Sequence, residues 1–475
     1  MVALRRHASL VGRLTAAVAA AVLLASCSAE ETPTDHESKS RTLGFTGCAK
    51  AACSGTIDGA KYQVRMPKTW NGTLLLYSHG YREAEPSPPD FAPVETDATV
   101  ASTPKTAEAL LAAGYALAGS AYAKNGWAVA DGVQAGEKLH EWFRDNIGKP
   151  DRVYVWGDSL GGLITQTLAE KHPGWVSGAA PMCGVLAGLN LNLDLGLDVE
   201  YAVKTLFYPQ MKLTGFRSHA EAVNTFTEAQ KRIMAATKDV KNGVPKLIAI
   251  AAITDGPTRT ARFDGSSPTS TISAAVEAIL TGLGYATFGR YEIEQRVGGN
   301  PSSNEDADYA KRVSPAERTL ADTIAPGALD RALAALAAGQ RVSADSDARR
   351  AADKLGNPTG NLQDPTITLH TQYDQLVIVQ NETVFADRVR ASKRRKADLI
   401  QLYTAPPAKY TAPAPYGAGH CNFTVDERVG LIKSLDEWVR TGVAPQPEQI
   451  SAAMNGAKGL TPLYRPGPWP ATSDE

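Results

Sequence analysis

Residues 157–161 read Gly-Asp-Ser-Leu-Gly, a G-x-S-x-G motif centred on Ser159. A short apolar, β-type run precedes the motif, and a helix-compatible run follows it. A serine at a sharp turn between a strand and a helix presents its hydroxyl to a substrate, and the glycines permit a turn that side chains would obstruct. The motif in this setting predicts that Ser159 is the nucleophile of an acyl transfer.

A serine hydroxyl needs a base within hydrogen-bond reach, and the base needs an acid that orients it. For a serine on this kind of turn, the acid and then the histidine follow the serine along the chain. Of the eight histidines, His420 lies on a glycine-rich loop, residues 416–422, between the last predicted strand and the last predicted helix. We predict that His420 is the general base; the alternative is an exposed loop histidine. The other seven histidines are placed less well for this role. His7 lies in the leader, His36 in the linker after it, and His79 upstream of Ser159. His140 and His172 lie in or at the end of predicted helices, His219 in the insertion and His370 inside a predicted strand.

The orienting acid is expected at the carboxyl end of a strand, on the same sheet edge as the base. Asp374 follows the predicted strand at 366–371 and meets this condition. Asp364 precedes that strand and would lie at the wrong end of the sheet. Glu382, on the following helix, is the weaker alternative.

The oxyanion of acyl transfer requires preorganised N–H donors. The N–H of Leu160, directly after the nucleophile, is one expected donor. The loop after the strand at 73–77 reads Ser-His-Gly-Tyr and supplies the second, the N–H of Tyr81, because Gly80 allows close approach of the backbone. We interpret His79 as structural and not as a second base.

Strands and helices alternate between residues 73 and 182, which predicts a mostly parallel sheet with helices on both faces. A half-buried strand at 62–66 precedes this region, and the alternation resumes at 366. The expected strands lie at 73–77, 115–119, 152–156, 175–180, 366–370 and 398–403, and the expected helices at 106–113, 133–147, 163–171, 376–391 and 425–439.

The core is thus expected at 44–184 and 361–459, with a large, mainly helical insertion at 185–360 that acts as a cap or lid. Within the insertion, Lys246–Ile253 could be a strand or a buried helix, because periodicity does not separate the two. The proline-rich tail at 460–475 has too few apolar residues in register for us to predict whether it docks on the core.

The first 27 residues have the features of an export signal. Basic residues precede an apolar stretch at 14–25, which is too short for a comfortable membrane span. The stretch ends in Leu-Ala-Ser-Cys at Cys27, which resembles the lipobox of bacterial lipoproteins. The resemblance implies lipidation of Cys27 and anchoring to the outer face of the bacterial cell membrane, with residues 28–43 as a flexible tether. The alternative is an ordinary secretory signal.

Four of the five cysteines remain after Cys27, and an even number in an exported protein suggests disulfides. Cys48 and Cys53 are close in sequence, so we expect a local bridge. Cys183 and Cys421 would form the remaining pair, although other pairings stay possible.

With these elements in this order, the chain resembles the α/β-hydrolase superfamily over about 44–182 and 361–445. The resemblance implies that Ser159, Asp374 and His420 are nucleophile, acid and base, and that the insertion lies where caps of that superfamily often enter. The His-Gly pair at 79–80 matches the oxyanion loop, but the longer H-G-G-G run of one esterase branch is absent.

The run Gly-His-Cys at 419–421 is similar to a pattern in secreted feruloyl-esterase and tannase-like enzymes. In the tannase-like pattern, a cysteine directly before the serine pairs with the cysteine after the histidine. Asp158 occupies that position here, so the detailed resemblance fails. We predict Cys183 as the partner of Cys421, because Cys183 follows the next strand and lies at the same sheet edge.

The formal net charge of −1 gives no indication of nucleic-acid binding. The sequence contains no metal-binding motif, no P-loop and no dinucleotide fingerprint, so neither a metal nor a cofactor is expected. We therefore expect a hydrolase of small-molecule carboxylic esters. Expected pocket residues are His79, Gly80, Tyr81, Trp127 and Tyr373.

Two alternatives to the esterase remain. A prolyl-type serine exopeptidase shares the triad and would cleave short peptides; it needs carboxylates in the insertion, for which Glu200, Glu292 and Glu294 are candidates. A lipid-tethered binding protein without catalysis is the second alternative.

Overall fold

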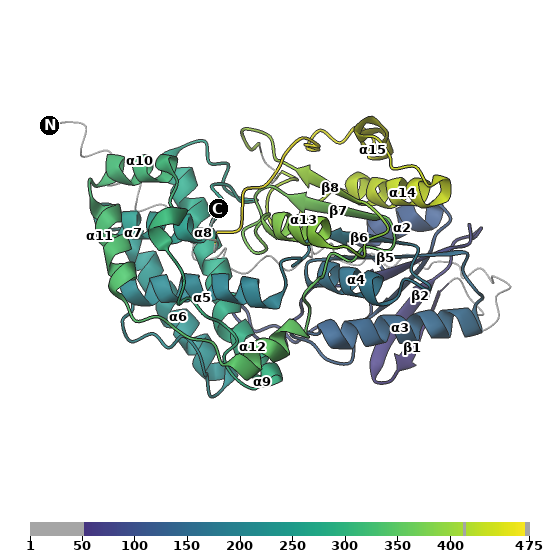
Figure 1. The fold of residues 1–475 in the computed structure, drawn as a ribbon, viewed down its shortest axis with the longest axis horizontal. Coiled ribbons are helices and arrows are strands. Elements are labelled where there is room, and N and C mark those ends of the chain that lie inside the picture. The colour runs from purple at the N-terminus through teal and green to yellow at the C-terminus, as the bar shows by residue number, and fades with distance from the viewer. Residues whose placement is uncertain (1–51, 412–414, 471–475) are drawn as a thin grey trace.

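The computed structural model describes residues 52–411 and 415–470. Eight strands form one sheet in the order β1-β2-β4-β3-β5-β6-β7-β8 (Figure 1). The first two strands are antiparallel to their neighbours, and all pairs from β4 to β8 are parallel. The strands are β1 Ala52–Ile57, β2 Ala60–Arg65, β3 Thr73–Ser78, β4 Ala116–Ser120, β5 Arg152–Asp158, β6 Gly178–Met182, β7 Thr366–Thr371 and β8 Leu399–Thr404.

Helices cover both faces of the sheet, so the central strands are buried along most of their length. Every residue of β3, β4, β6 and β7 is buried. Helices α3 (Val129–Asn146) and α4 (Leu160–Lys171) pack on one face, and α2 (Pro104–Ala112), α14 (Val425–Thr441) and α15 (Pro447–Ala453) lie on the other (Figure 1). Both faces thus have a core of their own.

This strand order, together with the serine turn between β5 and α4, is the α/β-hydrolase fold, so the fold predicted from the sequence is confirmed. Some boundaries differ from the prediction. Strand β6 begins at Gly178 and not at Trp175, and α13 spans Asn381–Ala391. The predicted helix start at Leu376 is wrong because the Asp374 carboxylate accepts hydrogen bonds from the backbone N–H groups of Leu376 and Val377, which makes this segment a turn.

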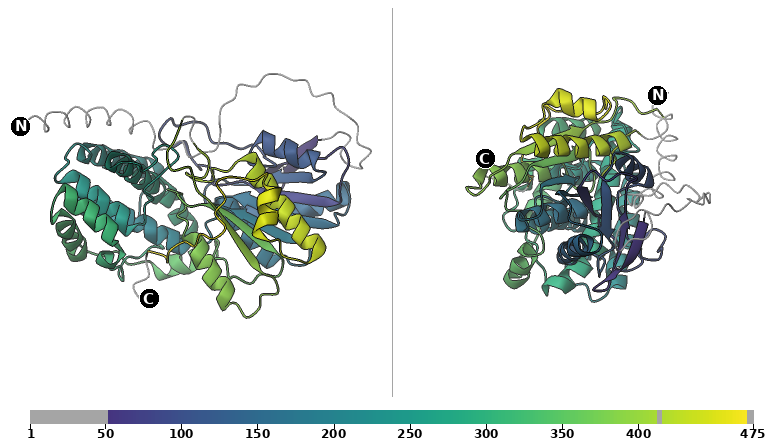
Figure 2. Two further views of the ribbon diagram at one scale, coloured as in Figure 1. Left: turned by 90° about the horizontal axis from the view of Figure 1, so that it is seen from above. Right: turned by 90° about the vertical axis from the view of Figure 1, so that its right-hand side faces the viewer.

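The residues between β6 and β7 form a separate helical layer beside the carboxyl ends of the strands (Figures 1 and 2). This cap has its own hydrophobic core. The Lys246–Ile253 segment, ambiguous in the sequence, is a buried helix. The elements of the cap are α5 Leu189–Leu206, α6 His219–Ala236, α7 Gly243–Ile253, α8 Pro268–Gly284, η1 Tyr285–Gly289, α9 Arg290–Val297, η2 Tyr309–Arg312, α10 Pro315–Ile324, α11 Ala328–Ala338 and α12 Ser346–Asp353.

Helices α8 and α9 are joined by a π-helical turn, η1, into one continuous helix over Pro268–Val297. It is long and apolar enough to cross a membrane by length and composition, but 83% of its most apolar window is buried inside the protein. It is therefore the central helix of the cap. π-Helical turns of this kind often occur at functional sites.

The described part of the C-terminal tail docks on the protein. Thr461 N–H donates to the Tyr403 carbonyl of β8. Trp469 is buried in a small cluster with Ala187, Leu195 and Ile378. The tail therefore contacts both the cap and the loop that carries Asp374.

Candidate active site

Ser159 lies at the junction of β5 and α4 with φ 59° and ψ −123°. A positive φ is unusual for a residue that is not glycine and marks a strained turn. A Cβ on Gly157 would lie 2.3 Å from the Ser78 carbonyl oxygen, and one on Gly161 would lie 2.0 Å from the same atom. Both glycines of the motif are therefore required sterically, because strand β3 passes directly beside the turn.

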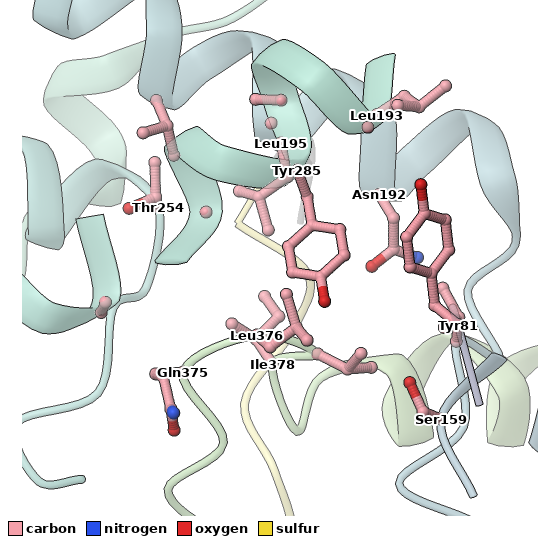
Figure 3. A pocket seen from close by; sticks show the side chains of 18 of the residues that line it. Tyr81, Ser159, Asn192, Leu193, Leu195, Thr254, Tyr285, Gln375, Leu376 and Ile378 are labelled. Atoms are coloured by element: carbon pink, nitrogen blue, oxygen red, sulfur yellow. The ribbon is translucent and has the colours of Figure 1, made fainter. Parts of the chain in front are cut away.

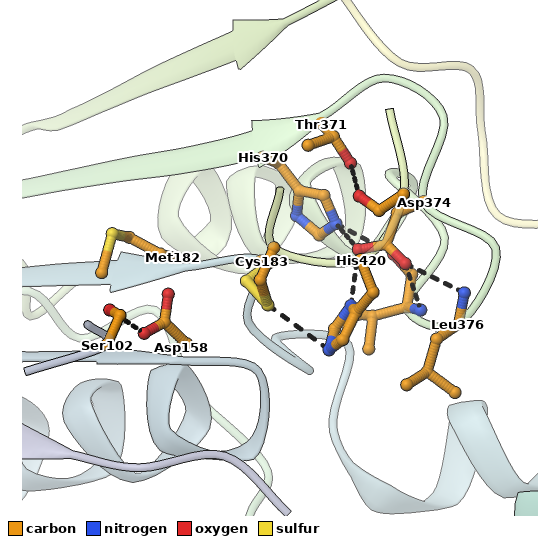
Figure 4. Close-up of a disulfide and its surroundings, with 12 residues drawn as sticks. Ser102, Asp158, Met182, Cys183, His370, Thr371, Asp374, Leu376 and His420 are labelled. Carbon is orange, nitrogen blue, oxygen red and sulfur yellow. Dashed lines mark hydrogen bonds and ion pairs between the residues drawn. A yellow bond between two sulfur atoms is a disulfide. The ribbon is translucent and has the colours of Figure 1, made fainter. Parts of the chain in front are cut away.

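His420 and Asp374 are brought together from two different loops. His420 Nδ1 lies 2.7 Å from Asp374 Oδ2, so the ring donates to the carboxylate (Figure 4). The Gly419 N–H donates to the Tyr373 carbonyl, and the Thr371 hydroxyl donates to the Gly419 carbonyl. These backbone contacts fix the histidine loop on the end of β7.

The charge on Asp374 is stabilised by its neighbours. Burial opposes ionisation of this carboxyl, but the charges and hydrogen bonds of His420 and His370 outweigh burial and hold its pKa below the ordinary value. Its other oxygen accepts two backbone N–H groups at 2.9 Å. An ionised carboxylate that holds Nδ1–H leaves Nε2 of His420 available as a base.

Nε2 of His420 lies 3.4 Å from Sγ of Cys421, and within residues 52–411 and 415–470 it has no hydrogen bond to the Ser159 hydroxyl. Catalytic hydrogen bonds are often long or poorly aligned before substrate binds. Cys421 is joined to Cys183 in a disulfide, with Cα atoms 5.4 Å apart, which is the pairing that we predicted. Because these sulfurs are bonded to each other, they offer no thiolate for a metal.

Two backbone segments lie beside Ser159. Leu160 begins α4, and its N–H points out of the helix start, where no intrahelical acceptor exists. A Cβ on Gly80 would lie 3.3 Å from Cβ of Ser159, so the Gly80–Tyr81 backbone runs directly alongside the nucleophile. These are the two segments from which we predicted oxyanion donors.

His79 is buried and stacked on Tyr122, with ring centres 4.0 Å apart. Its Nδ1–H donates to the Gly80 carbonyl, which supports the loop beside the nucleophile. Burial, reinforced by the charge of Arg82, lowers the pKa of His79 to about 3. His79 is therefore a neutral packing residue at neutral pH.

A cavity of about 130 Å³ opens above Ser159 between the core and the cap. In Figure 3 the Ser159 hydroxyl points into this cavity, and the Tyr285 ring projects into it from the cap. Tyr81 and Trp127 line the cavity, as predicted, whereas His79, Gly80 and Tyr373 are not part of its lining. The cap supplies most of the remaining wall, including Asn192, Leu193, Leu195, Val199, Ile279, Tyr285 and Ile293.

No lysine, arginine, aspartate or glutamate belongs to this lining. Glu200 forms a fully buried ion pair with Arg290. Glu292 accepts the Trp127 N–H and pairs with Arg296, and Glu294 accepts the Gly215 N–H. The three carboxylates proposed for exopeptidase selection thus have partners within the cap or, for Glu292, between cap and core, and none of them lines the cavity.

Two buried networks beside the site were not predicted. Asp158, directly before the nucleophile, forms an ion pair with Arg428 of α14 and accepts the Tyr77 hydroxyl. His370 of β7 lies between Asp374 and Glu382. The sequence signal for both was a polar residue inside an otherwise apolar element, but its partner lies on another element and could not be read from the sequence.

Cys27 and Cys48 lie outside the described residues, so the lipidation site and the Cys48–Cys53 bridge stay predictions.

A comparison with models of protein families finds no match. An o-phthalyl amidase from Xanthobacter agilis is 22% identical over 429 residues, which cover 83% of this chain and 89% of the amidase. Among solved structures, the cell wall degrading esterase LipA from Xanthomonas oryzae is 13% identical with a TM-score of 0.32, and 73% of this chain and 78% of the esterase are covered. Feruloyl esterase B from Aspergillus oryzae is 13% identical with a TM-score of 0.36, and 83% and 80% are covered.

Proposed function

We propose that this protein is a serine hydrolase that cleaves carboxylic esters through an acyl-enzyme on Ser159. The observation that carries the proposal is the strained backbone of Ser159, which directs its hydroxyl into an apolar cavity between core and cap. Strain of 1–3 kcal/mol at a single residue persists where the surrounding structure enforces it, typically at functional sites.

The proposed reaction uses each group in turn. His420 accepts the Ser159 proton as the oxygen attacks the acyl carbon, and Asp374 stabilises the imidazolium that forms. The N–H groups of Leu160 and Tyr81 bind the oxyanion. His420 then protonates the leaving alcohol, and water cleaves the acyl-enzyme by the same steps.

The cavity supports a compact, uncharged acyl group. An enclosed apolar cavity of about 150 Å³ accommodates a benzene ring, and the cavity here is of similar size. A charged group would lose its hydration there without a compensating partner. Short alkanoyl and aromatic acyl groups therefore fit better than long chains.

The same mechanism cleaves amides, and the name of the similar protein, o-phthalyl amidase, supports an aromatic acyl group and a C–N bond as a second candidate. The carboxylate that a phthalyl group carries would find no charged partner in the lining of this cavity, so an uncharged aromatic acyl group fits it better. A prolyl-type exopeptidase is disfavoured because Glu200, Glu292 and Glu294 are engaged elsewhere. A binding protein without catalysis would have no need of the strained serine.

The test is turnover of p-nitrophenyl acetate, butyrate, benzoate and decanoate beside phthalyl and aminoacyl p-nitroanilides. We expect hydrolysis of the acetate, butyrate and benzoate and little of the decanoate. Anilide turnover without ester turnover would replace the esterase proposal by an amidase. Turnover of neither, with Ser159 inert to a fluorophosphonate, would favour the binding protein.

We also propose that the protein is exported and lipid-anchored through Cys27, as the leader sequence indicates. Metabolic labelling with a radioactive fatty acid in a bacterial host should mark the protein and not its Cys27→Ser variant.

A further inference from the structure

His370 lies on β7, four residues before Asp374, and is completely buried. Its Nε2 is 2.9 Å from the carbonyl oxygen of Val377 and 3.5 Å from Asp374 Oδ2. A carbonyl oxygen only accepts hydrogen bonds, so Nε2 carries a proton. In Figure 4 the rings of His370 and His420 both approach the Asp374 carboxylate, His370 from above and His420 from below in this view.

The other ring nitrogen, Nδ1, faces Glu382 Oε1 at 3.4 Å. Either Nδ1 is also protonated and faces a carboxylate, or it is bare and faces a protonated acid. The second oxygen of Glu382 accepts the Thr368 hydroxyl at 2.7 Å and the Gln401 amide at 2.6 Å. Two donors on one oxygen favour the ionised carboxylate, and therefore a doubly protonated ring.

The charged groups that face this ring come from two elements. Asp374 comes from the turn after β7, and Glu382 comes from α13. On the neighbouring strand β8, Tyr403 is in register with His370, and burial raises the pKa of its phenol, which therefore stays uncharged. Burial lowers the pKa of His370, but the hydrogen bonds and charges of Asp374 and Glu382 outweigh burial and raise it to about 10.

We propose that His370 is a positively charged positioning residue, which links Glu382 to Asp374 and sets the pH range in which His420 acts as a base. The proposal rests on the hydrolase mechanism above and extends the triad into a chain, Glu382–His370–Asp374–His420. The cation holds Asp374 ionised and in place. It also offsets part of the attraction that Asp374 exerts on a second proton at His420, which must be absent before Nε2 can act as a base.

The charge on His370 should affect how kcat/KM falls on the acid side of its pH profile (the acid limb), because only neutral His420 accepts the serine proton. His370→Gln removes the positive charge and retains an N–H donor. The two carboxylates then act on His420 without compensation, its proton is held more tightly, and the acid limb of kcat/KM moves to higher pH by on the order of one unit.

Two control variants accompany His370→Gln. Glu382→Gln removes a negative charge from the same buried cluster, so the acid limb of kcat/KM in this variant should not move to higher pH. His172→Gln makes the same substitution at a histidine on the far end of α4 and should leave the profile unchanged. An unchanged limb in folded His370→Gln, or an equal rise in Glu382→Gln, would overturn the proposal.

A second measurement needs neither turnover nor a variant of His370. NMR of the protein labelled with ¹⁵N-histidine, recorded at pH 8, reports which ring nitrogens carry protons. We expect one buried histidine with both ring nitrogens protonated. A spectrum in which every histidine ring carries a single proton would contradict a positive charge on His370. This result would not depend on whether the protein is an esterase.

Discussion

Arg428 of α14 forms a buried ion pair with Asp158, the residue directly before the nucleophile. Its second nitrogen donates to the carbonyl of Cys421, the residue directly after His420, at 2.8 Å. One side chain thus connects the serine turn to the histidine loop. The Cys183–Cys421 disulfide makes a parallel connection from the end of β6, so the relative position of nucleophile and base is fixed twice.

Replacing Arg428 by Met should lower the free energy of unfolding by about 3–5 kcal/mol, because the buried Asp158 carboxylate loses its cation. Urea unfolding followed by circular dichroism measures the loss. Arg440→Met, the same change in an exposed ion pair on the same helix, should leave the free energy of unfolding nearly unchanged, because water screens that pair. Equal losses in the two variants would show that the buried pair has no special role.

Gly161→Ala should be destabilising by about 1–3 kcal/mol, although alanine usually favours a helix, because the added methyl would collide with the Ser78 carbonyl. Gly282→Ala is the matched control: this glycine is also helical, and its added methyl would meet only Val199 at 3.6 Å. We expect the control to be neutral or stabilising in thermal unfolding. A Gly161 variant as stable as the control would contradict the tight turn.

Asp374→Asn should lower kcat by on the order of 10³–10⁴-fold, since the amide no longer stabilises the imidazolium form of His420. Asp364→Asn should retain most of the activity, because Asp364 lies before β7, at the opposite end of the strand from the site. Steady-state kinetics on p-nitrophenyl butyrate compares the two. A similar loss of kcat in both variants would contradict the assignment of Asp374 as the acid that orients His420.

Stability should fall on acidification partly through His79. Its pKa in the folded protein is about 3, below the ordinary value of 6.5, because the ring is buried. Between pH 6.5 and 3 the unfolded chain binds a proton that the folded chain does not, so the contribution present above pH 6.5 is lost as pH falls, at up to about 1.4 kcal/mol per pH unit.

The loss is measured by urea unfolding of the unsubstituted protein and His79→Gln at pH 7 and pH 4.5. The free energy of unfolding should change less between pH 7 and pH 4.5 in the variant, because the variant has no ring to protonate at this position. An equal pH dependence in both proteins would show that His79 is protonated in the folded state.

Much of the fold could be predicted because its signals are local. The apolar runs of β3 and β5, the glycines around Ser159 and the polar turn after β7 each indicate their structure within a few residues. Strand β1 was missed because its residues are mostly exposed and show no clear alternation. The Gly243–Ile253 helix stayed ambiguous because it is buried on all sides and so has no polar face.

The cavity and the two buried networks depend on contacts between distant segments. Arg428 and Asp158 are 270 positions apart, and Tyr285 lines the cavity from η1 in the cap, far along the chain from Ser159. Periodicity shows that a residue is buried, but not which residue it meets. For the same reason, His370 looked like an ordinary strand residue in the sequence, whereas in the structure it faces two carboxylates.

If Ser159 carries the acyl group, the acyl-enzyme is detected by the mass of the intact protein after rapid acid quench during turnover of p-nitrophenyl benzoate. We expect an added benzoyl mass that maps to the peptide containing Ser159, and neither adduct nor turnover in Ser159→Ala. Undiminished turnover by Ser159→Ala, or an adduct on another residue, would contradict this expectation.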